Sequence, residues 1–156
     1  MLYDFAISLG SECFTNVLIK KNYGTDKKFY PSFPINNVKS FNFSKIILLF
    51  KNNFKDLLNK KYIIKKKKEQ KNIKYDIIFI HEDILRDDSK LKLRLIRLKK
   101  LLSLNFSYLF IRIENIFSNF FIDSEIAKNN CKLFVKMIIK IYKIKNFKLL
   151  YIYEDK

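Results

Sequence analysis

Residues 75–80 read Tyr-Asp-Ile-Ile-Phe-Ile, and this stretch decides the fold that the sequence predicts. A short run of apolar and β-branched residues of this kind is typical of a strand buried on both faces of a parallel sheet. Leucines recur at helical spacing along residues 90–102, and a second apolar run follows at 106–113. We therefore expect a strand, a helix and another strand in this region, with residues 75–80 as the central strand of the sheet.

Hydrophobic periodicity and turn residues predict further elements on both sides of this unit. In chain order they are a strand at 3–9, helices at 11–22 and 44–58, a helix from 123 to about 145, and a strand at 147–153. Between them, residues 23–42 are expected to be irregular, and the lysine run at 65–68 is expected to lie in a solvated loop.

The resulting order, β-α-α-β-α-β-α-β, favours a parallel sheet with helices on its faces. The fold class expected is therefore α/β, with three layers and about four mostly parallel strands flanked by helices. A chain of 156 residues fits one domain, which we expect to span residues 1–156.

The formal net charge of +17 suggests nucleic acid as a partner. However, the lysine excess accompanies an excess of Ile, Phe and Asn, which is the composition that A/T-rich codons produce. Arginine, the usual residue for bidentate phosphate and base contacts, occurs only four times. Nucleic acid is therefore a partner that we consider but do not favour.

Cofactor and metal sites are not expected. One His and two Cys exclude a Cys/His zinc module, and Gly10 lacks the further glycines of a dinucleotide fingerprint. The N-terminal sequence has no basic region before its apolar run, and no stretch approaches the ~18 apolar residues of a membrane-spanning helix. We expect a cytoplasmic protein with reduced thiols and no transmembrane segment. Its oligomeric state is left open.

Polar and reactive side chains follow three of the predicted strands. In open parallel sheets, ligands bind at the carboxyl ends of the strands. These ends are Ser8 to Cys13, His81-Glu82-Asp83, and Arg112 to Asn115. The single His and one of the two cysteines therefore both fall on the edge where a site is expected, whereas Cys131 falls inside a predicted helix, where packing is the simpler interpretation.

Cys13 lies in the first turn of the predicted helix at 11–22. Backbone amides and the helix dipole favour a thiolate there, and His81 as its base would complete a minimal Cys-His nucleophile. The structural alternative is that Cys13 is a small buried apolar residue and that His81 is a hydrogen-bonded core residue.

An ordered set of motifs extends this hypothesis. Ile7-Ser8-Leu9-Gly10-Ser11-Glu12-Cys13 resembles the opening of a bacterial family of uncharacterised domains described as papain-like cysteine peptidases. Further similar motifs follow in the same order over roughly residues 3–113: Tyr30 to Ile35, Asn52-Asn53-Phe54, His81-Glu82-Asp83, Arg94-Leu95-Ile96-Arg97 and Leu109-Phe110-Ile111-Arg112. The resemblance implies Cys13 as nucleophile and His81 as general base, with Gly10 and Ser11 shaping the turn.

The sequence departs from this family at identifiable positions. Pro34-Ile35 replaces the Asp-Trp of the family, and Glu82 replaces the Asp that follows its His. The family also often continues further at its C-terminus. These departures leave open a catalytically inactive member, and a domain without some C-terminal elements of the family. A third group that orients the imidazole is not fixed by the sequence, and its candidates are Glu82, Asp83, Asn16 and Asp155.

Three arginines near the predicted edge have two interpretations. Arg94 and Arg97 are i,i+3 neighbours on one helix, and with Arg112 they are candidates for binding a phosphate or carboxylate of a substrate. The alternative is ion pairing with Asp87, Asp88 or another acid.

Two classes of function remain in competition. The first is a cysteine-nucleophile hydrolase or acyltransferase, acting on a peptide, acyl or glycan-type substrate through an acyl-enzyme. The second is a non-catalytic basic module that binds nucleic acid or an anionic surface, or an inactive relative retained for interaction.

Overall fold

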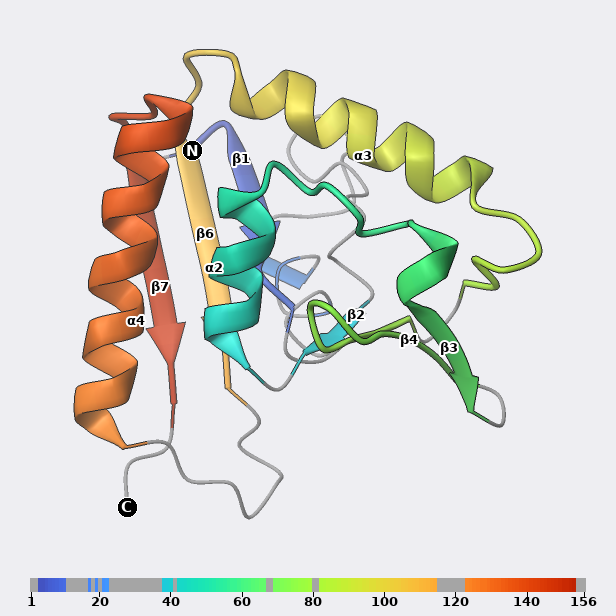
Figure 1. Ribbon diagram of the computed structural model, residues 1–156. Coiled ribbons are helices and arrows are strands. Elements are labelled where there is room, and N and C mark those ends of the chain that lie inside the picture. The colour runs from blue at the N-terminus through green and yellow to red at the C-terminus, as the bar shows by residue number, and fades with distance from the viewer. Residues whose placement is uncertain are drawn as a thin grey trace.

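The computed structural model describes residues 3–10, 17, 19, 21–22, 38–40, 42–66, 69–79, 82–114 and 123–153. Within these ranges the strands form two sheets (Figure 1). A parallel sheet has the order β1-β6-β7, with β1 at Phe5–Ser8, β6 at Tyr108–Ile113 and β7 at Phe147–Ile152. An antiparallel sheet has the order β2-β5-β4-β3, with β2 at Val38–Ser40, β5 at Ile77–Phe79, β4 at Glu69–Asn72 and β3 at Ile63–Lys66.

Strand β6 is the centre of the parallel sheet. All of its residues are buried, because it pairs with β1 on one side and β7 on the other. Ile111 is the register partner of both Ser8 and Leu150. A strand enclosed in this way reads as a continuous apolar run, which explains the sequence Tyr-Leu-Phe-Ile.

Helices α2 (Phe43–Lys51) and α4 (Ser124–Met137) cover one face of this sheet, and both lie in front of it in Figure 1. The π-helix η2 (Ile138–Tyr142) continues α4. The core between these layers is aromatic, since the ring of Phe134 lies 5.6 Å from that of Phe50 and 5.2 Å from that of Phe110. Helix α3 (Ser89–Leu102) adds Leu91, Leu98 and Leu102 to the same core.

The opposite face of the parallel sheet has its own small cluster. Ala6 of β1 and Leu109, Ile111 and Ile113 of β6 pack there with Ile19. Ile19 is helical, as are Val17, Lys21 and Asn22. The helix expected at 11–22 is therefore helical wherever the structure describes it.

Several predicted elements are confirmed. The strands expected at 3–9, 106–113 and 147–153 are β1, β6 and β7, and the helix expected at 90–102 is α3. The helix expected from 123 to about 145 is α4 with η2, and it begins where the Asp123 carboxylate accepts hydrogen bonds from the backbone N–H groups of Glu125 and Ile126. The chain is a mixture of helices and strands with a parallel sheet, as an α/β class requires.

The central strand was predicted wrongly. Residues 77–79 form β5, but β5 pairs antiparallel with β2 and β4 and belongs to the second sheet. The parallel sheet therefore has three strands in the described part of the chain. The fourth expected strand, β5, belongs to the antiparallel sheet instead. Residues 73–76 form the turn between β4 and β5, and Asp76 in this turn is left-handed with φ of 53°, so β5 runs back along β4.

Two further boundaries differ from expectation. Helix α2 ends at Lys51 rather than at residue 58, because Asn53, Phe54 and Asp56 have positive φ angles of 48°, 59° and 66°. Lys65 and Lys66 lie in β3, which pairs with β4, rather than in a loop. The short helix η1 (Lys60–Tyr62) leads into β3. None of the helices described here has both the length and the apolarity needed to cross a membrane.

Candidate functional site

A buried ion pair lies at the carboxyl end of β6. Arg112 is the penultimate residue of the strand, and its Nε and Nη2 groups donate to the two carboxylate oxygens of Glu114 at 2.9 and 2.7 Å. Both side chains are almost completely buried, at 0% and 6% exposure. They lie two residues apart in an extended segment and therefore point to the same face of the sheet.

The guanidinium of Arg112 also connects two strands that are distant in the sequence. Its Nη1 group donates to the backbone carbonyl of Leu9 at 3.2 Å, directly after β1. Its Nη2 group donates to the carbonyl of Ser40 at 2.8 Å, at the end of β2. Arg112 thus ties the carboxyl end of the parallel sheet to the antiparallel sheet.

Hydrogen bonds with β6 and with Ser8 fix the turn after β1. The Leu9 N–H donates to the carbonyl of Ile111 at 2.8 Å, and the hydroxyl of Ser8 accepts from the N–H of Gly10 at 3.3 Å. Gly10 is buried and has a φ of 71°, a conformation in which a side chain would clash with the backbone. The glycine predicted to shape this turn therefore occupies a position that requires it.

Aromatic residues surround the ion pair. The Tyr151 hydroxyl of β7 donates to Glu114 Oε1 at 2.6 Å, and burial, with the adjacent carboxylate, raises the pKa of this phenol. The ring of Phe43 lies 5.5 Å from the guanidinium carbon of Arg112, which is a cation–π contact. Burial and the Glu114 carboxylate also raise the pKa of the Cys131 thiol, which disfavours its thiolate form.

The acidic and basic residues after β5 bind one another. Glu82 Oε1 accepts from Arg94 Nη1 at 2.5 Å, which is the ion-pairing alternative considered for this arginine. The Asp83 carboxylate accepts from the side-chain amide of Gln70, and this hydrogen bond lowers the pKa of Asp83. Arg97, on the same helix as Arg94, is exposed.

The two principal predicted residues, Cys13 and His81, lie outside the described residues. The same holds for Ser11, for Asn16 and Asp155 as candidate orienting groups, and for Pro34-Ile35. Among the predicted site residues that the structure describes, Gly10 and Arg112 lie together at the carboxyl end of the parallel sheet. Glu82 and Arg94 form a second pair. In the described part of the chain, no three His, Cys, Asp or Glu side chains are grouped as metal ligands.

Glu114 and Tyr151 were not predicted, although the sequence contains a signal for the first. In Leu-Phe-Ile-Arg-Ile-Glu, an arginine stands within an apolar strand and a glutamate follows on the same face. A buried arginine requires an acidic partner, and the i,i+2 position supplies one. Tyr151 carries no such local signal, because its contact with Glu114 depends on the pairing of β6 with β7.

Comparisons of the chain with protein-family models, with curated proteins and with solved structures found no match.

Proposed function

We propose that this chain is a cysteine-nucleophile enzyme, a papain-like peptidase or related acyl-transfer enzyme, with the Cys13 thiolate as nucleophile and His81 as base. One observation supports the proposal above the others. The buried Arg112 binds the Leu9 carbonyl, and the buried Gly10 follows with positive φ, so the chain leading to Cys13 starts from a rigid turn at the carboxyl end of β1. A nucleophile on a rigid element is what reproducible attack geometry needs.

The proposed reaction uses groups of this chain, the acyl substrate, and either water or an acceptor hydroxyl. The Cys13 sulfur attacks the carbonyl carbon of the substrate, and backbone N–H groups of residues 11–14 stabilise the oxyanion. The bond to the leaving amine or alcohol breaks as the His81 imidazolium gives it a proton, which leaves a thioester. Water, or an acceptor hydroxyl, then attacks the thioester while His81 takes its proton, and the thiolate leaves.

The remaining predicted residues have narrower roles in this proposal. We assign Arg112 to positioning the Leu9–Gly10 turn, because its donors are directed at Glu114 and at two backbone carbonyls. Glu82 and Asp83 are engaged with Arg94 and Gln70, so substrate contacts from this region fall to the exposed Arg97.

We also propose a three-layer arrangement around the parallel sheet. Helices α2 and α4 cover one face (Figure 1), and Ile19 and Asn22 lie on the other. The burial of Ile19 against Leu109 and Ile111 supports the second layer.

The reactivity of the thiol tests the proposal directly. Iodoacetamide alkylation of Cys13 is measured against pH by peptide mass spectrometry, in the wild type and in His81→Ala. An ordinary thiol titrates near pH ~8.5. We expect Cys13 to react well below that pH and to lose this advantage in His81→Ala. Cys131 is the internal control, since burial raises its pKa and we expect its alkylation to need a higher pH.

Acylation provides the second readout. Incubation with p-nitrophenyl acetate is expected to place one acetyl group on Cys13, detected by intact mass and peptide mapping, and Cys13→Ser is expected to abolish this fast thiol acylation. A Cys13 that titrates as an ordinary thiol in both proteins and accepts no acetyl group contradicts the proposal and favours an inactive or purely binding protein.

A further inference from the structure

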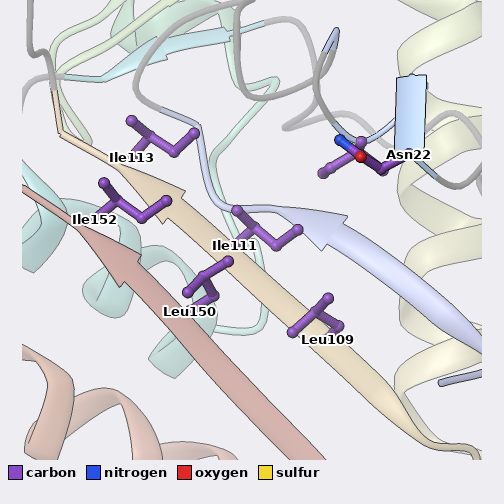
Figure 2. Close-up of a pocket in the computed structure, with 7 residues that line it drawn as sticks. Asn22, Leu109, Ile111, Ile113, Leu150 and Ile152 are labelled. Atoms are coloured by element: carbon purple, nitrogen blue, oxygen red, sulfur yellow. The ribbon is translucent and has the colours of Figure 1, made fainter. Parts of the chain in front are cut away.

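An apolar groove runs along the face of the parallel sheet opposite α2 and α4. Leu109, Ile111 and Ile113 of β6 and Leu150 and Ile152 of β7 form its floor, and Ile19 and Asn22 line one side (Figure 2). The groove has a volume of about 300 Å³, at the lower end of the range for small-molecule sites. Leu150 and Ile152 remain 44% and 41% exposed, so the β7 side of the floor is open to a ligand.

The lining restricts the chemistry of an occupant. Its side chains are branched aliphatic groups with one amide, that of Asn22. A sugar, nucleotide or peptide placed along this floor would lose hydrogen bonds to water without replacement, which costs free energy for every unpaired polar group. A hydrocarbon chain loses no hydrogen bonds and gains the transfer free energy of its methylene groups.

A cation stands at one end of the same face. Residues 148, 150 and 152 alternate with the inward residues of β7, so the Lys148 side chain points to the groove side of the sheet together with Leu150 and Ile152. Lys148 is exposed and is the register partner of Leu109, at the end of the groove opposite Ile113 and Ile152. In the ranges that the structure describes, no ion pair involves Lys148.

Two acids lie near the ends of β6: Asp4 is bound to the N–H and hydroxyl of Ser107, and Glu114 is bound to Arg112. Glu114 projects with Arg112 to the opposite face of the sheet, where it is buried. The groove therefore combines an aliphatic floor with a positive charge at one end, in a chain of net charge +17. From Lys148 to Ile152 the floor spans about 13 Å at the usual rise of ~3.3 Å per strand residue.

We propose that this groove binds a free medium-chain aliphatic carboxylate. The carboxylate pairs with the ammonium group of Lys148, and the chain lies extended over Leu109, Leu150 and Ile111 toward Ile113 and Ile152. Binding of this ligand requires neither Cys13 nor His81, so it holds or fails independently of the acyl-transfer chemistry.

Decanoate is the probe, titrated into the full chain at concentrations below micelle formation and followed by NMR of ¹³C-labelled Ile and Leu methyl groups. We expect saturable shifts confined to the methyl groups of the groove, with those of Leu93 on α3 as an internal reference. Octanoate is expected to bind at least threefold more weakly, since each buried methylene contributes up to ~0.8 kcal/mol. Decanol is expected to bind several-fold more weakly, because it lacks the charge.

Two variants test the charge of Lys148 and the aliphatic floor separately. Both change exposed side chains so that folding is preserved. Lys148→Gln is expected to weaken decanoate three- to fivefold, as removal of a surface ion pair does, and to leave decanol unchanged. Leu150→Asp, which places a carboxylate in the groove, is expected to weaken both ligands at least tenfold. The matched controls on α4, Lys132→Gln and Leu133→Asp, are expected to change neither affinity.

Several results overturn the proposal. It fails if folded protein shows no saturable decanoate shifts, or if the shifts lie outside the groove. It also fails if Lys148→Gln weakens decanoate no more than Lys132→Gln does. Binding to phosphatidylcholine or phosphatidylglycerol vesicles without binding to monomeric decanoate would assign this face to a membrane surface instead. Cross-peaks from the groove methyl groups to another part of this chain, without decanoate binding, would show that the protein fills the groove itself.

Discussion

Arg112 and Glu114 bind each other through two parallel hydrogen bonds at the carboxyl end of β6, where the exposed fraction of both side chains is close to zero. Removing such a pair from water has a large desolvation cost, and the attraction between the partners offsets it only when the geometry is good and the remaining polar atoms are satisfied. Tyr151 supplies a further hydrogen bond to Glu114, and the carbonyls of Leu9 and Ser40 accept from Arg112.

We expect Arg112→Met to lower the free energy of unfolding by about 3–5 kcal/mol, because the buried Glu114 carboxylate loses its counterion and two carbonyls lose their donor. Urea unfolding followed by circular dichroism measures the change. The double variant Arg112→Met/Glu114→Met is expected to be more stable than Arg112→Met alone. As a control, Lys92→Met breaks the ion pair between the exposed Lys92 and the partly buried Asp88, and is expected to change stability by less than ~0.5 kcal/mol. Equal effects of Arg112→Met and Lys92→Met would contradict this assignment.

Asp4 joins the start of β1 to the start of β6, and its effect on stability is expected to depend on pH. Its carboxylate accepts from the backbone N–H and the hydroxyl of Ser107, each at 2.7 Å, and these bonds lower its pKa. A carboxyl whose folded pKa lies below the unfolded value of ~3.9 stabilises the fold above that pH, and this contribution is lost as the pH falls through the folded pKa.

Asp4→Asn should therefore flatten the loss of stability below about pH 4, measured by urea unfolding at a series of pH values. Ser107→Ala removes one donor and keeps the backbone N–H, so its acid dependence is expected to lie between those of wild type and Asp4→Asn. Identical acid dependence in wild type and Asp4→Asn would show that the hydrogen bonds of Asp4 do not favour its charged form.

The sequence predicts the elements whose residues interact locally, and it fails where an element depends on distant partners. Strand β6 and helix α4 were predicted correctly, because burial on both faces and an Asp N-cap leave local patterns. The run Ile77–Phe79 carries the same pattern as β6, and periodicity does not indicate which sheet a strand joins. Its true partners are β2, in a stretch expected to be irregular, and β4, which reads as polar.

The hairpin of β3 and β4 was missed for a related reason. Most of β3 is exposed, so its sequence shows no alternation, and β4 buries Gln70 and Asn72 rather than apolar residues. For the candidate site, the sequence indicated Gly10 as the residue that ends the first strand, and it left Arg112 as either a substrate-binding or an ion-pairing residue. The structure shows Arg112 paired with Glu114. The sequence did not predict that Arg112 binds Leu9, 103 positions away, because that contact depends on the pairing of β1 with β6.

Asn72 is the buried polar residue that holds this hairpin to the turn after α2. Its amide nitrogen donates to the carbonyls of Asp56 and Leu57, both at 2.9 Å, and its amide oxygen accepts from the N–H groups of Lys74 and Tyr75 at 3.0 and 3.1 Å. Asn72→Leu has a similar shape but leaves these groups unpaired. We expect it to lower the free energy of unfolding by about 2–4 kcal/mol in urea.

The control for Asn72 is an exposed asparagine of helix α4. Asn129 donates to Glu125 at 3.3 Å on the surface, and Asn129→Leu is expected to change stability by less than ~0.5 kcal/mol. If Asn72→Leu proves no more harmful than Asn129→Leu, the four hydrogen bonds of Asn72 do not stabilise the hairpin.

Substitutions of Asn53 test whether the turn that ends α2 is left-handed. It is exposed, has a φ of 48°, and its N–H donates to the Phe50 carbonyl at 2.8 Å. A Cβ is unfavourable in this conformation by about 1–2 kcal/mol, less for asparagine than for alanine, and glycine has no such cost. We therefore expect Asn53→Ala to lose about 1 kcal/mol of unfolding free energy and Asn53→Gly to stay within ~0.5 kcal/mol of wild type. Asn105→Ala, at an exposed position without positive φ, should have little effect, and an Asn53→Ala variant as stable as Asn53→Gly would mean that the turn is not left-handed in solution.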